Sequence, residues 1–62
     1  MLFVELNTQS IHGQEILARV QSEDWHEMMN YLKKKGYHQH PMVLSSIDGE
    51  WTAEVYEKPD EL

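Results

Sequence analysis

Ser-Glu-Asp-Trp-His-Glu-Met-Met-Asn-Tyr-Leu-Lys-Lys-Lys-Gly-Tyr, residues 22–37, is the stretch that decides the fold. Its apolar side chains recur at the spacing of one helix face, which predicts an amphipathic helix over residues 23–35. Ser22 is expected to cap the N-terminus of this helix, and Gly36 supplies a left-handed residue that ends it. Because the apolar stripe occupies a single face, it must pack against another element. That stripe consists of Trp25, Met28, Met29 and Leu32.

A second strong signal is Asp48-Gly49, which lies between two segments of alternating apolar and polar residues. This dipeptide favours a type I′ turn, in which both central residues have positive φ. We therefore predict a hairpin over residues 42–56, with Ile47 opposite Glu50 beside the turn. In this register one face of the hairpin is apolar. The residues of that face are Met42, Leu44, Trp51, Ala53 and Val55.

The N-terminal part of the chain predicts a second pair of strands. Residues 1–6 are short and apolar, and residues 7–13 form a connecting loop in which Ile11 is expected to be half exposed or tucked under the sheet. Residues 14–21 fit either a strand or a helix, and the strand is preferred because a separate helix follows immediately. The order β-β-α-β-β indicates a small α+β fold in a single domain, residues 1–62. In it, one helix packs on one face of a mainly antiparallel sheet.

One helix is too narrow to cover both faces of a four-stranded sheet. Its stripe should pack against the inward-facing residues of the strands, which are Leu2, Val4, Leu6, Ile16, Ala18, Val20, Leu44, Trp51, Ala53 and Val55. The opposite face would expose several apolar side chains, and such patches usually mark an interface. We predict that the chain pairs with a second copy, face to face or edge to edge, with these side chains at or near the contact. The candidate interface residues are Phe3, Leu17, Val43, Ile47 and Tyr56.

Composition excludes several classes of protein. The 62-residue chain has no cysteine, which excludes disulfides and thiolate metal sites in a domain too small to bury a large core. Its formal net charge is −6, and such a surface is repelled by phosphates, which argues against direct binding to nucleic acid. No apolar run approaches the ~20 residues of a membrane span, and no signal peptide is recognisable. We therefore expect no membrane partner and a cytoplasmic location.

The histidines are the main candidates for metal chemistry. If their segment is extended, His38 and His40 lie on one side of it and could share a metal ion with Glu57, with Asp60 or with a second subunit. Two histidines at this spacing are a weak pattern, however, so we assign no metal site and no cofactor. No local motif places a nucleophile beside a base, and there is no glycine-rich phosphate loop. The sequence therefore predicts neither catalytic residues nor an enzyme.

These features together favour a non-enzymatic small acidic protein that acts through protein–protein contacts, as a homodimer. Its size and acidity are typical of a regulator or inhibitor of bacterial or phage origin, which is an association rather than a mechanism. One alternative is an acidic mimic that occupies a DNA- or RNA-binding site on a partner protein. A second alternative is a protein that binds metal through histidine. Spaced carboxylates on one continuous surface would favour the mimic, whereas an apolar patch on a mixed surface would count against it.

Overall fold

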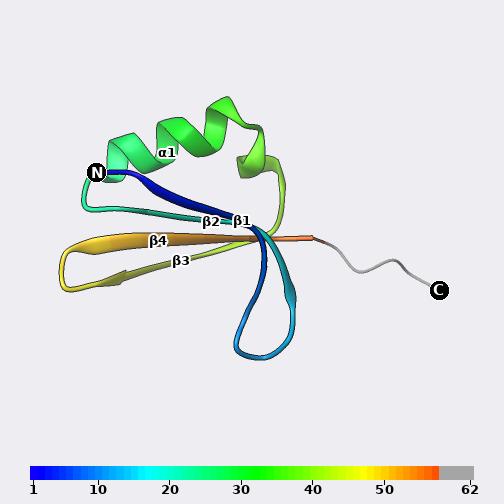
Figure 1. The fold of residues 1–62 in the computed structure, drawn as a ribbon. Coiled ribbons are helices and arrows are strands. Elements are labelled where there is room, and N and C mark those ends of the chain that lie inside the picture. The colour runs from blue at the N-terminus through cyan, green and yellow to red at the C-terminus, as the bar shows by residue number, and fades with distance from the viewer. Residues whose placement is uncertain (58–62) are drawn as a thin grey trace.

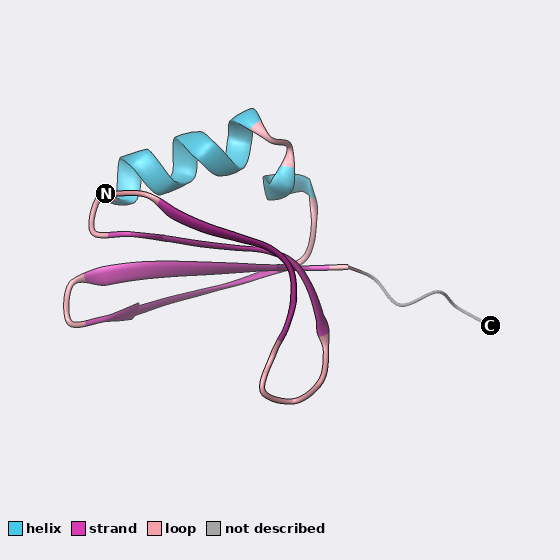
Figure 2. Ribbon diagram, in the orientation of Figure 1, coloured by secondary structure: helices cyan, strands magenta, loops and turns pink. Residues whose placement is uncertain are grey.

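A computed structural model describes residues 1–57 as strands, one α-helix and one short 3-10 turn. These elements are β1 Phe3–Gln9, β2 Glu15–Ser22, α1 Trp25–Lys34, η1 Tyr37–Gln39, β3 Met42–Ile47 and β4 Glu50–Tyr56. The strands form one antiparallel sheet in the order β1-β2-β4-β3, and α1 lies across one of its faces (Figures 1 and 2). The α+β fold and the order β-β-α-β-β are therefore confirmed, and residues 15–21 of the ambiguous segment 14–21 lie in β2.

The helix begins at Trp25, two residues later than predicted, because Asp24 and not Ser22 caps it. Oδ1 of Asp24 accepts hydrogen bonds from the backbone N–H groups of His26 and Glu27, at 2.9 and 3.3 Å. Ser22 instead ends β2, where its backbone pairs with β4. Its buried hydroxyl accepts a hydrogen bond from the N–H of Asp24. The prediction of a Ser22 cap was wrong because pairing holds this residue in the sheet, and the carboxylate of Asp24 satisfies the free helix donors.

The positions that the sequence assigned to positive φ are confirmed. Gly36 follows α1 with φ of 77°, which only a residue without a Cβ adopts at little cost. At the β3–β4 turn, φ is 53° for Asp48 and 79° for Gly49. Ile47 lies opposite Glu50, and the predicted register holds along the whole hairpin. The turn chemistry and the apolar pattern therefore specify the same pairing.

The β1–β2 hairpin is longer than predicted. Strand β1 runs to Gln9 instead of ending at residue 6, because it pairs with β2 as far as Glu15. The loop shrinks to residues 10–14, and Ile11 within it is almost fully exposed, so the expectation that it would be half exposed or tucked under the sheet was wrong. Figure 1 shows this end of the hairpin bending away from α1, next to a register shift in the pairing of β2 with β4. Such bulges bend a strand and increase its twist.

The core lies between α1 and the two central strands, β2 and β4. Its fully buried cluster consists of Ala18, Val20, Met28, Leu32, Ala53 and Val55. Trp25 and Trp51 are partly buried beside it and meet edge to face, with ring centroids 4.7 Å apart. Leu6 and Leu44 are 55% and 43% exposed, so their predicted place in the core was wrong. They lie on the outer strands β1 and β3, which one helix is too narrow to cover.

Candidate protein-interaction surface

The face of the sheet turned away from α1, here called the open face, carries no helix in the described part of the chain (Figure 1). Side chains directly opposite each other on paired strands lie on the same face, so the register arranges them in rows across the sheet. One row runs through Glu5 on β1, Arg19 on β2, Glu54 on β4 and Val43 on β3. The middle of the open face therefore holds a basic side chain between two acidic ones.

Arg19 makes ion pairs with both of these carboxylates. Its Nη2 and Nε lie 3.2 and 3.4 Å from Oε2 of Glu54, and its Nη1 lies 3.3 Å from Oε1 of Glu5. The hydrogen bond to Glu54 is the largest cause of the raised pKa of Arg19, and the bond to Glu5 adds to it. The charged guanidinium thus links β1, β2 and β4 across the open face. Sequence reasoning missed this network because it depends on strand order, which no local pattern encodes.

The predicted interface residues are spread over all four strands and differ in exposure. Phe3 on β1 is 56% exposed, and Val43 and Ile47 on β3 are 52% and 72% exposed. Tyr56 on β4 is partly buried. Leu17, at the irregularity in β2, is also partly buried and packs against the core. Three of the five side chains are therefore largely available for contact, and their role in binding stays a prediction.

Known proteins give no guide to the role of this surface. No family model, curated protein or solved structure matches the chain. Within residues 1–57, neither helix is long and apolar enough to cross a membrane. The expected absence of a membrane partner and the cytoplasmic location both stay predictions.

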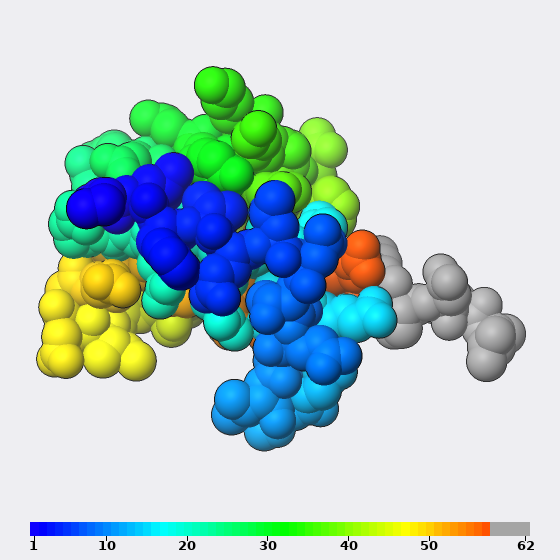
Figure 3. Space-filling view, viewed as in Figure 1, coloured from blue at the N-terminus to red at the C-terminus, as the bar shows by residue number. Residues whose placement is uncertain are grey.

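Strand β3 forms one edge of the sheet, a feature that the sequence alone did not identify. Every residue of β3 is partly or largely exposed, on both faces of the sheet. The space-filling view shows the β3–β4 turn projecting clear of α1 (Figure 3). Strand β3 also lies in Gly36–Ile47, the longest stretch of the chain without Asp, Glu, Lys or Arg. This stretch is visible in the sequence, but only the strand order shows that it contributes an edge of the sheet.

The structure does not build a metal centre around the candidate histidines. His38 lies in the 3-10 turn η1 and His40 directly follows it, so the extended segment assumed for a shared metal ion was wrong. Both residues are exposed. Within residues 1–57, no group of three or more His, Asp or Glu side chains could hold a metal ion, and Glu57 is among the residues searched. Asp60, the other proposed ligand, lies outside the described residues.

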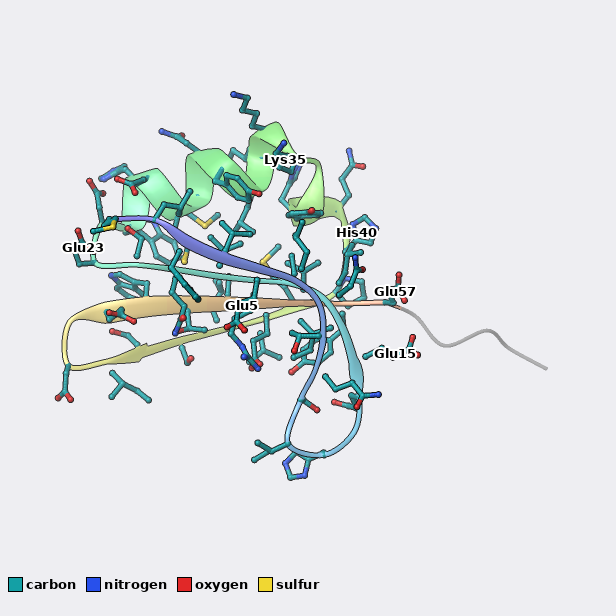
Figure 4. The ribbon with its side chains drawn as sticks, viewed as in Figure 1. Glu5, Glu15, Glu23, Lys35, His40 and Glu57 are labelled. Atoms are coloured by element: carbon teal, nitrogen blue, oxygen red, sulfur yellow. The ribbon has the colours of Figure 1, made fainter. Side chains whose placement is uncertain are left out.

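A hollow lies at the loop end of β1 and β2. It is lined by Asn7, Thr8, Gln9, Glu15, Ile16 and Glu57. Figure 4 shows Glu15 and Glu57 at the same end of the sheet. The lining offers two carboxylates and three uncharged polar side chains, but no basic group or nucleophile paired with a base. Its acidity would suit a cationic group, although the side chains alone define no reaction.

The pairing of His26 with Asp24 is a second candidate for acid–base chemistry, and it is also exposed to water. His26 Nδ1 lies 4.0 Å from Oδ1 of Asp24, and the imidazole is almost fully exposed. That carboxylate oxygen already accepts the two hydrogen bonds that cap α1. The arrangement therefore stabilises the helix end, and it provides no enclosed place for a substrate. Within residues 1–57, the open face exposes large apolar side chains, and β3 forms an edge of the sheet.

Proposed function

We propose that this protein is a non-enzymatic regulator or inhibitor that acts by binding another protein through the open face. The observation that carries the proposal is the exposure of Phe3, Val43 and Ile47 on a sheet face that lacks a covering layer in the described part of the chain. Covering the exposed half of each side chain would contribute roughly 1 kcal/mol per residue. Antiparallel sheets commonly expose one face to solvent, but large apolar side chains on that face are typical of a contact surface.

The Arg19 network supports the same proposal. Interfaces combine an apolar part with a few charged groups that fix orientation, and aromatic and Arg side chains are enriched in them. Here Arg19 is held in place by Glu5 and Glu54, so little conformational freedom would be lost on binding. The open face thus offers a rigid polar centre with apolar side chains toward both edges.

The net charge of the chain favours one kind of partner. The net charge of −6 favours a partner whose contact surface is apolar and has a basic rim, because opposite fields speed the encounter and suppress wrong partners. Mimicry of nucleic acid is less well supported, since it needs free, regularly spaced carboxylates. On the open face, Glu5 and Glu54 are already paired with Arg19, and the remaining residue of their row is the apolar Val43.

The test begins with capture of a partner from the source cell and ends with the purified pair. Calorimetry would measure the dissociation constant for the wild-type chain, for Phe3→Glu and for Ile47→Glu. We expect each substitution to weaken binding by roughly tenfold or more, which corresponds to about 1.4 kcal/mol. The matched control is Ile11→Glu, which places the same charge at an exposed aliphatic residue in the β1–β2 loop. Equal affinities for all four chains would overturn the open face as the binding surface.

A further inference from the structure

The outer edge of β3 presents unpaired backbone groups in a regular pattern. Ile47 and Glu50 flank a two-residue turn, so they exchange hydrogen bonds, and every second residue back along β3 does the same with β4. The N–H of Tyr56 donates to the carbonyl of Pro41 at 2.9 Å, which continues this alternation. The backbone groups of the intervening residues of β3 point away from β4. The N–H and C=O groups that face outward are therefore those of Met42, Leu44 and Ser46.

The two edges of the sheet differ in how they are protected. Strand β1 carries the charged Glu5, and Asn7 in its middle has φ of 54°, which interrupts the flat edge that another strand would need. Natural proteins use such charges and irregularities to prevent edge pairing. Strand β3 has neither device, and within residues 1–57 nothing covers its outer side. It is therefore the edge that is suited to accept another strand.

We infer that two copies of this protein pair antiparallel through β3, about a two-fold axis that passes between their Leu44 residues. The two four-stranded sheets then join into one continuous sheet of eight strands. Both helices lie on one side of this sheet, and both open faces lie on the other. The pairing goes beyond the proposed function because it uses the edge and leaves the open face free for a different protein.

The side chains of β3 are complementary to a second copy in this register. Met42 lies opposite Ser46 of the second copy, and Val43 lies opposite Ser45 of the second copy, so each large side chain meets a small one. On the helix side, Leu44 meets its own counterpart, which would cover the exposed part of this side chain. The outward N–H and C=O groups of the strand then pair with the same groups of the second copy.

Charge restricts self-association to this segment. Each copy carries a net charge of −6, so two copies repel each other, and any contact that brings their carboxylates together is costly. The segment Gly36–Ile47 has no Asp, Glu, Lys or Arg. In an antiparallel pair, the end of β3 next to Asp48 meets the end next to His40 of the second copy. No carboxylate is therefore set directly opposite a carboxylate.

Sedimentation equilibrium from micromolar to millimolar concentration tests the pairing. We expect the wild-type chain to approach twice its 7.4 kDa mass. Leu44→Lys should return the mass to that of one chain, because it places a charge at the centre of the contact. The matched control is Leu6→Lys, which changes the same residue type on the same face at the opposite edge and should leave the dimer intact. A wild-type monomer at every concentration would overturn the inference, and so would a folded Leu44→Lys chain that remains dimeric.

A cross-linking test does not depend on a disruptive substitution. The chain has no cysteine, so a single Leu44→Cys provides one reactive thiol. Directly opposed residues in a hydrogen-bonded antiparallel pair have Cα atoms about 5.5 Å apart, within the range that a disulfide spans. Mild oxidation should join Leu44→Cys chains into covalent dimers much faster than Leu6→Cys chains. Equal rates would overturn the pairing. The monomeric Leu44→Lys chain is also tested for binding to the partner protein. Because this chain keeps the open face, its binding tests the proposed function separately from the dimer.

Discussion

Replacing Arg19 by Gln tests whether the ion network holds the open face together. The change removes a cation from between Glu5 and Glu54 and leaves two carboxylates with no opposite charge in their row. Ion pairs that are partly open to water contribute about 0.2–1 kcal/mol each, so the two together set an expected loss of about 1 kcal/mol.

The two pairs should contribute unequally. Glu54 is 25% exposed and receives two contacts from the guanidinium, whereas Glu5 is 40% exposed and receives one. Water screens the more exposed pair more strongly. We therefore expect most of the coupling energy, about 0.5–1 kcal/mol, to lie between Arg19 and Glu54, and a smaller part between Arg19 and Glu5.

Two double-mutant cycles measure this difference. Arg19→Gln is combined with Glu54→Gln in one cycle and with Glu5→Gln in the other, and urea unfolding is followed by circular dichroism at one fixed protein concentration. Repeating the cycles at high salt should reduce both couplings, and that of Glu5 the more. A coupling to Glu5 equal to or larger than that to Glu54 would refute the geometry of the network.

Two further predictions concern the core and alkaline pH. Leu32→Ala should lower the free energy of unfolding by about 2–5 kcal/mol, because this side chain is fully buried, whereas Leu6→Ala should cost less than about 1 kcal/mol. Equal losses in urea unfolding would mean that α1 covers β1 after all. Partial burial, and then the nearby carboxylate of Glu54, raises the pKa of Tyr56 above its ordinary value of 10.0. The folded state therefore retains the phenol proton to a higher pH than the unfolded chain does. The resulting contribution to the free energy of unfolding is complete below pH 10.0 and is lost as the pH rises through the folded pKa. Above that pH, the midpoint temperature of thermal unfolding should fall less steeply with pH for Tyr56→Phe than for the wild-type chain. An unchanged pH dependence would contradict the assignment.

Local signals predicted the parts of the fold that depend on neighbouring residues. Asp48-Gly49 adopts positive φ at both positions, and the alternation beside it specifies one register, so the β3–β4 hairpin was predictable in detail. The helix was predictable from its spacing, but its first residue was not. Ser22 and Asp24 are both good caps, and only the pairing of Ser22 with β4 decides between them.

The sequence could not predict which strands lie at the edges. Pairing between β2 and β4 joins segments that are distant in the chain, and a different order would have put other residues at the centre. For this reason Leu6 and Leu44 were expected in the core, although both lie on outer strands. The Arg19 network was missed for the same reason, since its partners belong to β1 and β4. The apolar residues of the open face were predictable from alternation alone, because that pattern does not depend on order.

The uneven protection of the two sheet edges supports the proposed pairing through β3. Strand β1 carries a charge and an irregular residue at its edge, and the middle of the open face is closed by the ion pairs of Arg19. A domain this small has little stability to spare, so exposed apolar surface on a flat, uncharged strand is a liability unless something covers it. Strand β3 is such a strand, and Val43 and Ile47 project from it onto the open face. If copies pair at β3, each open face joins that of its neighbour, and the apolar side chains of β3 from both copies come together at the centre of one larger surface. Self-association would then enlarge the apolar surface that is open to a partner protein, and the protected edge of β1 would restrict such pairing to β3.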